Sequence, residues 1–339
     1  WLKPVTVCSC NFSITVYFLH TMGSENHRAL LAPKLADKLE SRGLDDEMLE
    51  VLMEKEGITY GKLDESQEPD MPRDARFSAL FFLRWCTYQV PEDPRKLAHY
   101  INAVQLFDLA AHSFIGSEKT VGPVWALAAA AWSVSIKMNS SSKEANCQLS
   151  QLAALAETLV GSPAVALQDI EQKEKAMLLK CNVSVTAPST WCSLFSTRLD
   201  AILNGVLTKE GHLEHLDAVL AKVLTMAVET LRVSRSHPPY TVAVGSFCLA
   251  LVAADLLPEA EVVDLQMQGT STQTQETVSV QTTLAWMKQN LGSPYPACIV
   301  PSKAMTAAAV VALHSNAQDM KLATTNLVKE ILLPRSQAR

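Results

Sequence analysis

Apolar residues recur at helical spacing along most of the chain, and short stretches with Pro, Gly or Ser separate these segments. This pattern predicts five helices, then five more, and a final amphipathic helix that stops at Pro334. The expected helices are Asp74 to Val90, Pro94 to His112, Val121 to Met138, Glu144 to Val160, Ala164 to Lys180, Pro188 to Leu203, Leu213 to Val233, Tyr240 to Leu257, Thr274 to Asn290, Ser302 to His314 and Asp319 to Leu333. The pattern indicates an all-α chain with a repeated architecture.

One of these segments is apolar on every side. The run VGPVWALAAAAWSVSIKMNSS is rich in alanine and ends on a single cation, Lys137. Small residues let neighbouring helices approach closely, so we expect this segment to be the central helix of a bundle. Lys137 would lie at the end of that helix, where the helix dipole favours a positive charge.

Polar breaks divide the chain into five parts. We expect residues 1–21 to lie upstream of the true start at Met22, because their short apolar run fits neither a signal peptide nor a bilayer span well; those remain the alternatives. Residues 22–71 would form an N-terminal helical arm, with two short amphipathic helices, and a polar linker. The two five-helix units would occupy 72–187 and 188–317, and residues 318–339 a C-terminal helix and tail.

Composition narrows the function classes. The net charge is −6 and no block of Lys and Arg is visible, so nucleic acid is not expected as a partner. The eight cysteines are scattered, several of them within apolar helical patterns, which indicates buried free thiols rather than a disulfide framework. The stretch QMQGTSTQTQETVSVQ is expected to begin as a flexible loop.

No catalytic motif is visible in the sequence. Nucleophile elbows, phosphate-binding loops and His-Glu zinc strings are missing, so we expect no enzyme activity, no cofactor and no small-molecule substrate. His212 and His215 lie on either side of Glu214. Because two histidines do not complete a zinc site, we predict no metal site there and expect a solvent-facing helix start.

A series of strings in a fixed order suggests a family. Trp85 lies in the first expected helix, Asp108 in LFDLAAHSF, Lys137 in SIKMNSS and Glu174 in IEQKEKAMLLKCNVSVTAPSTW. The string HPPYTVAVGSFCLALVAA follows in the second half. From roughly 74 to 260 this order resembles the cyclin family, and its D-type branch most closely. The matching turns and helix starts contain Ala187, Pro188, Ser189, His237, Pro238, Pro239, Val242, Ala243, Gly245 and Ser246.

The resemblance implies two cyclin boxes and the role of a regulatory subunit that catalyses no reaction itself. Lys137 and Glu174 would bind a serine/threonine cyclin-dependent kinase in a heterodimer, and Asp108, Pro188, Pro238, Pro239 and Gly245 would be structural. Such a subunit would control the cell cycle and cell division from the nucleus, the cytoplasm or both, with no membrane partner. The alternative is a cyclin-fold scaffold that binds a non-kinase partner, or a kinase without activating it.

The first expected helix departs from the family pattern. Ser78 and Ala79 replace a methionine-arginine pair that docks substrate motifs and holds the aspartate. Asp108 then needs another cation, and Arg76 or Arg84 is the candidate, because an unpaired buried carboxylate is costly. Trp85, Phe81 and Phe82 would belong either to the core or to a substrate-docking groove, and the core is the favoured interpretation.

Overall fold

The computed structural model describes residues 49, 51–54, 73–89, 96–114, 121–139, 149–160, 165–180, 187–230, 237–263, 273–291, 298 and 300–336. These residues form helices and no strand, so the all-α prediction is confirmed for this part of the chain. None of the described helices is both long and apolar enough to cross a bilayer. Residues 1–21 and most of the expected N-terminal arm lie outside the described residues, although 51–54 are helical.

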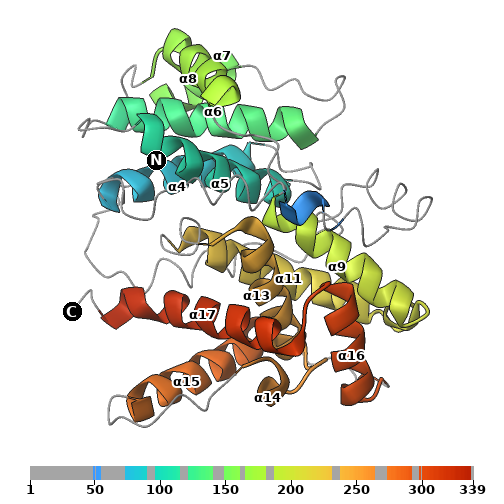
Figure 1. Cartoon of the computed structure of the whole chain (residues 1–339). Helices are drawn as coiled ribbons and strands as arrows, with labels where there is room; N and C mark the ends of the chain where they lie inside the picture. Colours follow the sequence, from blue (N-terminus) through green and yellow to red (C-terminus); the bar gives the residue numbers. More distant parts are fainter. Residues whose placement is uncertain are drawn as a thin grey trace, which may run out of the picture.

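The first group of helices is built around α6. It consists of α4 (Arg73–Tyr88), α5 (Lys96–Phe114), α6 (Val121–Asn139), α7 (Leu149–Val160) and α8 (Leu167–Lys180), which lie together in the upper part of Figure 1. The side chains of α6 from Val124 to Ile136 are all buried. Alanines on α6 allow α4, α5 and α8 to pack closely around it, as the alanine-rich sequence predicts.

The second group is built around α13. It consists of α9 (Pro188–Ile202), α10 (Val206–Lys209), α11 (His212–Glu229), α13 (Pro239–Ala253), α14 (Glu259–Val262), α15 (Gln273–Leu291), α16 (Ser302–Ala312) and α17 (Ala317–Ser336). Residues 242–254 of α13 and its C-cap are buried, like the centre of α6. Each group therefore has one central helix whose middle is fully buried.

The two groups share a packing pattern. In the first, α6 contacts α4, α5, α7 and α8, while α4 contacts α5 and α7 contacts α8. In the second, α13 contacts α9, α11, α15 and α17, while α9 contacts α11 and α15 contacts α17. The helix that corresponds to α8 is therefore α17, which the sequence pattern placed after the second set. Helix α16, expected as the fifth member of that set, packs against α9 instead.

Prolines and one glycine explain local features of this packing. Pro188 and Pro239 occupy the first turn of α9 and α13, where the missing N–H costs no helical hydrogen bond. Pro238 is the N-cap of α13. Gly245 faces α17 so closely that a Cβ would lie 3.1 Å from the carbonyl oxygen of Ala323 and 3.1 Å from Leu327 Cδ2. Gly245 thus permits the close approach of α13 and α17.

Several boundaries differ from the predicted ones. Helix α11 ends at Glu229 rather than Val233, and α13 ends at Ala253 rather than Leu257. Helix α17 continues through Pro334 instead of stopping there. The short helices α10 and α14 were not predicted because four residues are too few for a periodic signal. Residues 144–148, expected as the start of α7, and 266–272, expected as a loop, lie outside the described residues.

Candidate functional site

Lys137 and Glu174 form an ion pair at one edge of the first group. Lys137 lies in the last turn of α6, and Glu174 in the middle of α8. Lys137 Nζ contacts Glu174 Oε1, and Ser133 Oγ, one turn earlier on α6, donates to the same oxygen at 3.3 Å. The Lys137 side chain is 45% exposed, whereas Glu174 is 9% exposed. Glu174 is thus a buried anchor rather than part of an ordinary charged helix face.

Two exposed apolar side chains lie close in sequence to this ion pair. Met138 follows Lys137 directly, and Leu178 lies one turn after Glu174 on α8; both are exposed. Glu171 and Lys175 are exposed on α8. The edge formed by α6 and α8 therefore presents a half-exposed lysine, held by a buried carboxylate, together with exposed apolar side chains, a composition suited to contact with another protein.

Asp108 of α5 is buried and paired with Arg76 of α4. Arg76 Nε donates to Asp108 Oδ1 at 2.9 Å, and Nη2 donates to Oδ2 at 2.8 Å. Burial disfavours the charged guanidinium, but Asp108, with smaller effects from Tyr100 and Glu229, outweighs burial and raises the pKa of Arg76. Of the two candidate cations, Arg76 is therefore the partner of Asp108.

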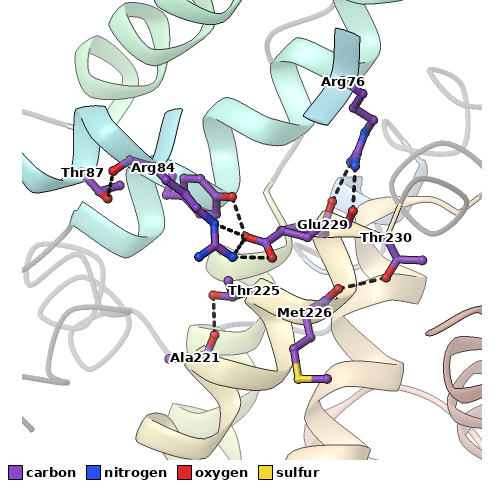
Figure 2. Close-up of polar contacts among 10 residues, drawn as sticks. Arg76, Arg84, Thr87, Ala221, Thr225, Met226, Glu229 and Thr230 are labelled. Carbon is purple, nitrogen blue, oxygen red and sulfur yellow. Dashed lines mark hydrogen bonds and ion pairs between the residues drawn. The ribbon is translucent and has the colours of Figure 1, made fainter. Parts of the chain in front are cut away.

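The same arginine reaches the second group. Arg76 Nη1 donates to the carbonyl oxygen of Glu229 at 2.7 Å, and Nη2 donates to that of Val228 at 2.9 Å. Figure 2 shows Arg76 extending from α4 to these carbonyls at the end of α11. The last carbonyls of a helix lack intrahelical donors and carry partial negative charge, so a guanidinium is favourable there. Arg76 thus joins the two groups.

Glu229 is the centre of a second contact between the groups. Arg84 binds its carboxylate in a bidentate manner, with Nε 3.0 Å from Oε1 and Nη2 2.6 Å from Oε2. The Tyr100 hydroxyl donates to Oε1 at 2.6 Å. Burial and the nearby Glu229 charge raise the pKa of Tyr100 well above its usual value, so the phenol stays protonated as a donor. No sequence string pointed to Glu229.

The aromatic residues of α4 divide between core and surface. Phe82 is 0% exposed and stacks on Trp125 with ring centroids 5.2 Å apart. Phe81 and Trp85 are exposed, so the favoured core interpretation is wrong for these two. Helical geometry explains the difference, because residues four apart share a face. The exposed face carries Phe77, Phe81, Trp85 and Tyr88.

The two positions that depart from the cyclin pattern have ordinary packing roles. Trp125 Nε1 donates to Ser78 Oγ at 2.6 Å, and Ala79 is fully buried. An arginine side chain would not fit at Ala79 without displacing its neighbours. Arg76, one turn earlier, instead holds Asp108.

The start of α11 is buried rather than solvent-facing. His212 and His215 both lie below the surface, so the expected exposed helix start is wrong. Asp217, further along α11, is also buried and accepts a hydrogen bond from Ser196 Oγ at 2.9 Å. Burial raises the pKa of Asp217 to about 7, and Glu214 adds to this effect. These residues are covered by packing that hydrophobic periodicity alone did not reveal.

The cysteine prediction holds for three described residues. Cys86, Cys192 and Cys248 are free and buried. Burial raises the pKa of Cys248 to about 12, which keeps its thiol protonated and unreactive. Cys298 is free and only half-buried. Cys8, Cys10, Cys147 and Cys181 lie outside the described residues.

Comparison with known proteins adds no family to this description. The chain matches none of the protein-family models, none of the curated proteins and none of the solved structures against which it was compared.

Proposed function

We propose that this chain is a cyclin-like regulatory subunit that binds a serine/threonine cyclin-dependent kinase and activates it, thereby controlling cell-cycle progression. The observation that carries the proposal is the contact between Lys137 and Glu174. These residues come from two separate strings that resemble the kinase-binding strings of cyclins. Their meeting at an exposed edge is what that resemblance implies.

The chemistry of the pair suits the proposed partner. A lysine ammonium has three donors, and a carboxylate has only acceptors, so together they can engage carbonyl and amide groups of one partner segment. Met138 and Leu178 supply apolar contact area beside them. A kinase becomes competent when its regulatory helix brings a glutamate to the catalytic lysine, so a subunit that docks this helix inward activates the enzyme.

The repeated packing pattern supports a two-box architecture. Central helix α6 contacts α4, α5, α7 and α8, and α13 contacts α11, α9, α15 and α17 in the same arrangement, with the short α14 as a further neighbour. In this proposal α4–α8 form the first box, and the second box consists of α9, α11, α13, α15 and α17. Helix α16 is then an addition to the second box. Kinase binding is assigned to the first box because Lys137 and Glu174 both lie there.

A charge exchange between Lys137 and Glu174 tests the proposal. In the double variant Lys137→Glu, Glu174→Lys, an ion pair can still form between the two positions, while the charge at each position is reversed. Wild type and variant would be used in parallel to capture purified cyclin-dependent kinases, with circular dichroism as the folding check. We expect the wild type to bind a kinase and the exchanged variant to lose at least tenfold in affinity.

A second exchange on the same helix provides the control. Glu171 and Lys175 are exposed on α8 and spaced one turn apart, so Glu171→Lys, Lys175→Glu alters surface charge beside the site. This control should bind like the wild type. Kinase binding that survives the exchange of Lys137 and Glu174 would contradict the proposed interface, and failure of the wild type to bind any cyclin-dependent kinase would contradict the function.

The second candidate function is a cyclin-fold scaffold. The observation that favours it is the first helix of the first group, where Ser78 and Ala79 replace the family's substrate-docking residues. A kinase assay separates the two candidates. An activating subunit raises the phosphorylation rate of a peptide substrate above that of kinase alone, whereas a scaffold that binds the kinase leaves the rate unchanged.

A further inference from the structure

Three potential metal ligands, one of them far from the other two in sequence, meet beside the start of α11. Glu210 follows α10, His212 is the first residue of α11, and Cys298 lies between α15 and α16. One ligand atom from each side chain lies within 4.8 Å of the other two. Since Cys298 is far away in sequence, this meeting exists only in the folded chain.

Backbone geometry directs two of these side chains toward each other. Gly211 separates Glu210 from His212 and has φ of 75°, a left-handed conformation that a residue with a Cβ adopts only at a cost. This turn places Glu210 Oε2 3.4 Å from His212 Nε2. His212 is 3% exposed and Glu210 is 30% exposed, so one ligand is fixed in the interior and the other opens to solvent.

The spacing fits a tetrahedral metal site. Two nitrogen or oxygen ligands about 2.1 Å from a tetrahedral Zn²⁺ lie about 3.4 Å apart, and a thiolate at about 2.3 Å lies about 3.6 Å from either of them. The observed 3.4 Å between Glu210 and His212 equals the first of these separations. It exceeds the usual range of about 2.7–3.2 Å for an N–H···O hydrogen bond. The Cys298 sulfur lies within 4.8 Å of the other two ligand atoms, so a shift of at most about 1.2 Å would complete the set.

We propose that Glu210, His212 and Cys298 bind a zinc-type divalent cation, with water in the fourth position. Thiolate and imidazole ligands favour Zn²⁺ over Mg²⁺ and Ca²⁺, which prefer oxygen alone. On binding, the Cys298 thiol gives its proton to solvent and its sulfur bonds to the metal. The ion would join the segment that enters α16 to the junction of α10 and α11. This site is independent of the proposed kinase function.

Protection of one thiol tests the site. The full chain would be prepared reduced and metal-free, treated with iodoacetamide with and without Zn²⁺, and the modified cysteines located by mass spectrometry. Cys86, Cys192 and Cys248 are buried and serve as slow internal references. We expect Zn²⁺ to slow alkylation of Cys298 at least tenfold. Alkylation of Cys298 at the same rate with and without Zn²⁺ would overturn the proposal.

Variants distinguish this site from other zinc-binding cysteines of the chain. Glu210→Gln and His212→Ala should each abolish the protection of Cys298, whereas the control Glu214→Gln, an exposed glutamate on the same helix, should leave it intact. If His212→Ala fails to fold, Glu210→Gln still tests the site, because Glu210 is partly exposed and its replacement should leave the fold intact. With Co²⁺ as the probe, thiolate-to-cobalt absorption should decrease in Cys298→Ser. Protection or absorption that is unchanged in these variants would contradict the assignment.

Discussion

Arg84 on α4 and Glu229 on α11 are 145 residues apart in sequence, yet they form a bidentate ion pair that joins the two helical groups. Tyr100 donates to the same carboxylate, and Arg76 caps the end of the same helix. The contact is partly buried, so its charges are weakly screened by solvent. The two groups are therefore fixed to each other by directional polar contacts as well as by the packing of α5 on α9 and α11.

Removal of the Glu229 side chain should weaken this junction. Glu229→Ala leaves Arg84 and the Tyr100 hydroxyl without this acceptor, and we expect a loss of about 1.5–3 kcal/mol in the free energy of unfolding. Urea unfolding measures it, and a double-mutant cycle with Arg84→Ala should give a coupling energy of at least about 0.5 kcal/mol. Additive single effects would show that the pair contributes nothing beyond its separate parts. Glu261→Ala, at an exposed position, is the control.

Neutralisation of Asp108 should lower the free energy of unfolding more than removal of the Glu229 side chain does. Asp108→Asn leaves the buried charge of Arg76 without its carboxylate, and breaking a buried pair in this way typically costs about 3–5 kcal/mol. Thermal unfolding would show a lower Tm for Asp108→Asn than for the wild type. Wild-type stability in Asp108→Asn would contradict the buried-pair interpretation.

Asp217 should make the protein less stable as pH rises. Its pKa is raised from 3.8 to about 7 in the folded state, so between these values the folded chain binds a proton that the unfolded chain does not. Stability therefore decreases from about pH 4 to about pH 7, by at most about 4 kcal/mol at about 1.4 kcal/mol per pH unit. Above about pH 7 this contribution no longer changes.

Replacement of this carboxyl isolates its effect. Asp217→Asn keeps an oxygen acceptor for Ser196 but removes the titration. We expect the variant to match the wild type near pH 4 and to be more stable near pH 8, as measured by urea unfolding at both values. Equal pH dependence of the two proteins would show that Asp217 is not the responsible group.

Phe81 and Phe82 are neighbours of the same type with opposite environments. Phe82→Ala should lower the free energy of unfolding by about 3–5 kcal/mol, because it opens a cavity beside Trp125. Phe81 is 41% exposed, so Phe81→Ala should cost about 1 kcal/mol or less. Chemical unfolding of both variants gives the comparison, and similar losses at the two positions would contradict the assigned orientation of α4.

Gly245 should tolerate no large side chain. Gly245→Val would place side-chain carbons against Ala323 and Leu327 of α17, and overpacking of this kind costs about 1–3 kcal/mol. Gly245→Ala should reduce the free energy of unfolding by less, because the higher helix propensity of alanine contributes about 1 kcal/mol that offsets part of the strain. The Tm should decrease from the wild type to Gly245→Ala and again to Gly245→Val. A valine variant as stable as wild type would show that α13 and α17 can separate freely.

The sequence by itself determined the long helices and one of the two central ones, α6. Apolar periodicity located the long helices, and the alanine run of α6 predicted a fully buried segment because small residues favour close packing on all sides. Family-like strings also singled out Lys137, Glu174 and Asp108 before any contact was known. These features are local, so a short window of residues contains the signal.

Only the tertiary structure decided which distant residues meet. It selected Arg76 rather than Arg84 for Asp108, made α17 rather than α16 the counterpart of α8, and turned Phe81 outward while Phe82 is buried. It also brought Cys298 to Glu210 and His212. Such contacts depend on how helices pack across the whole chain, and hydrophobic periodicity fixes the face of a helix but not the identity of its neighbour.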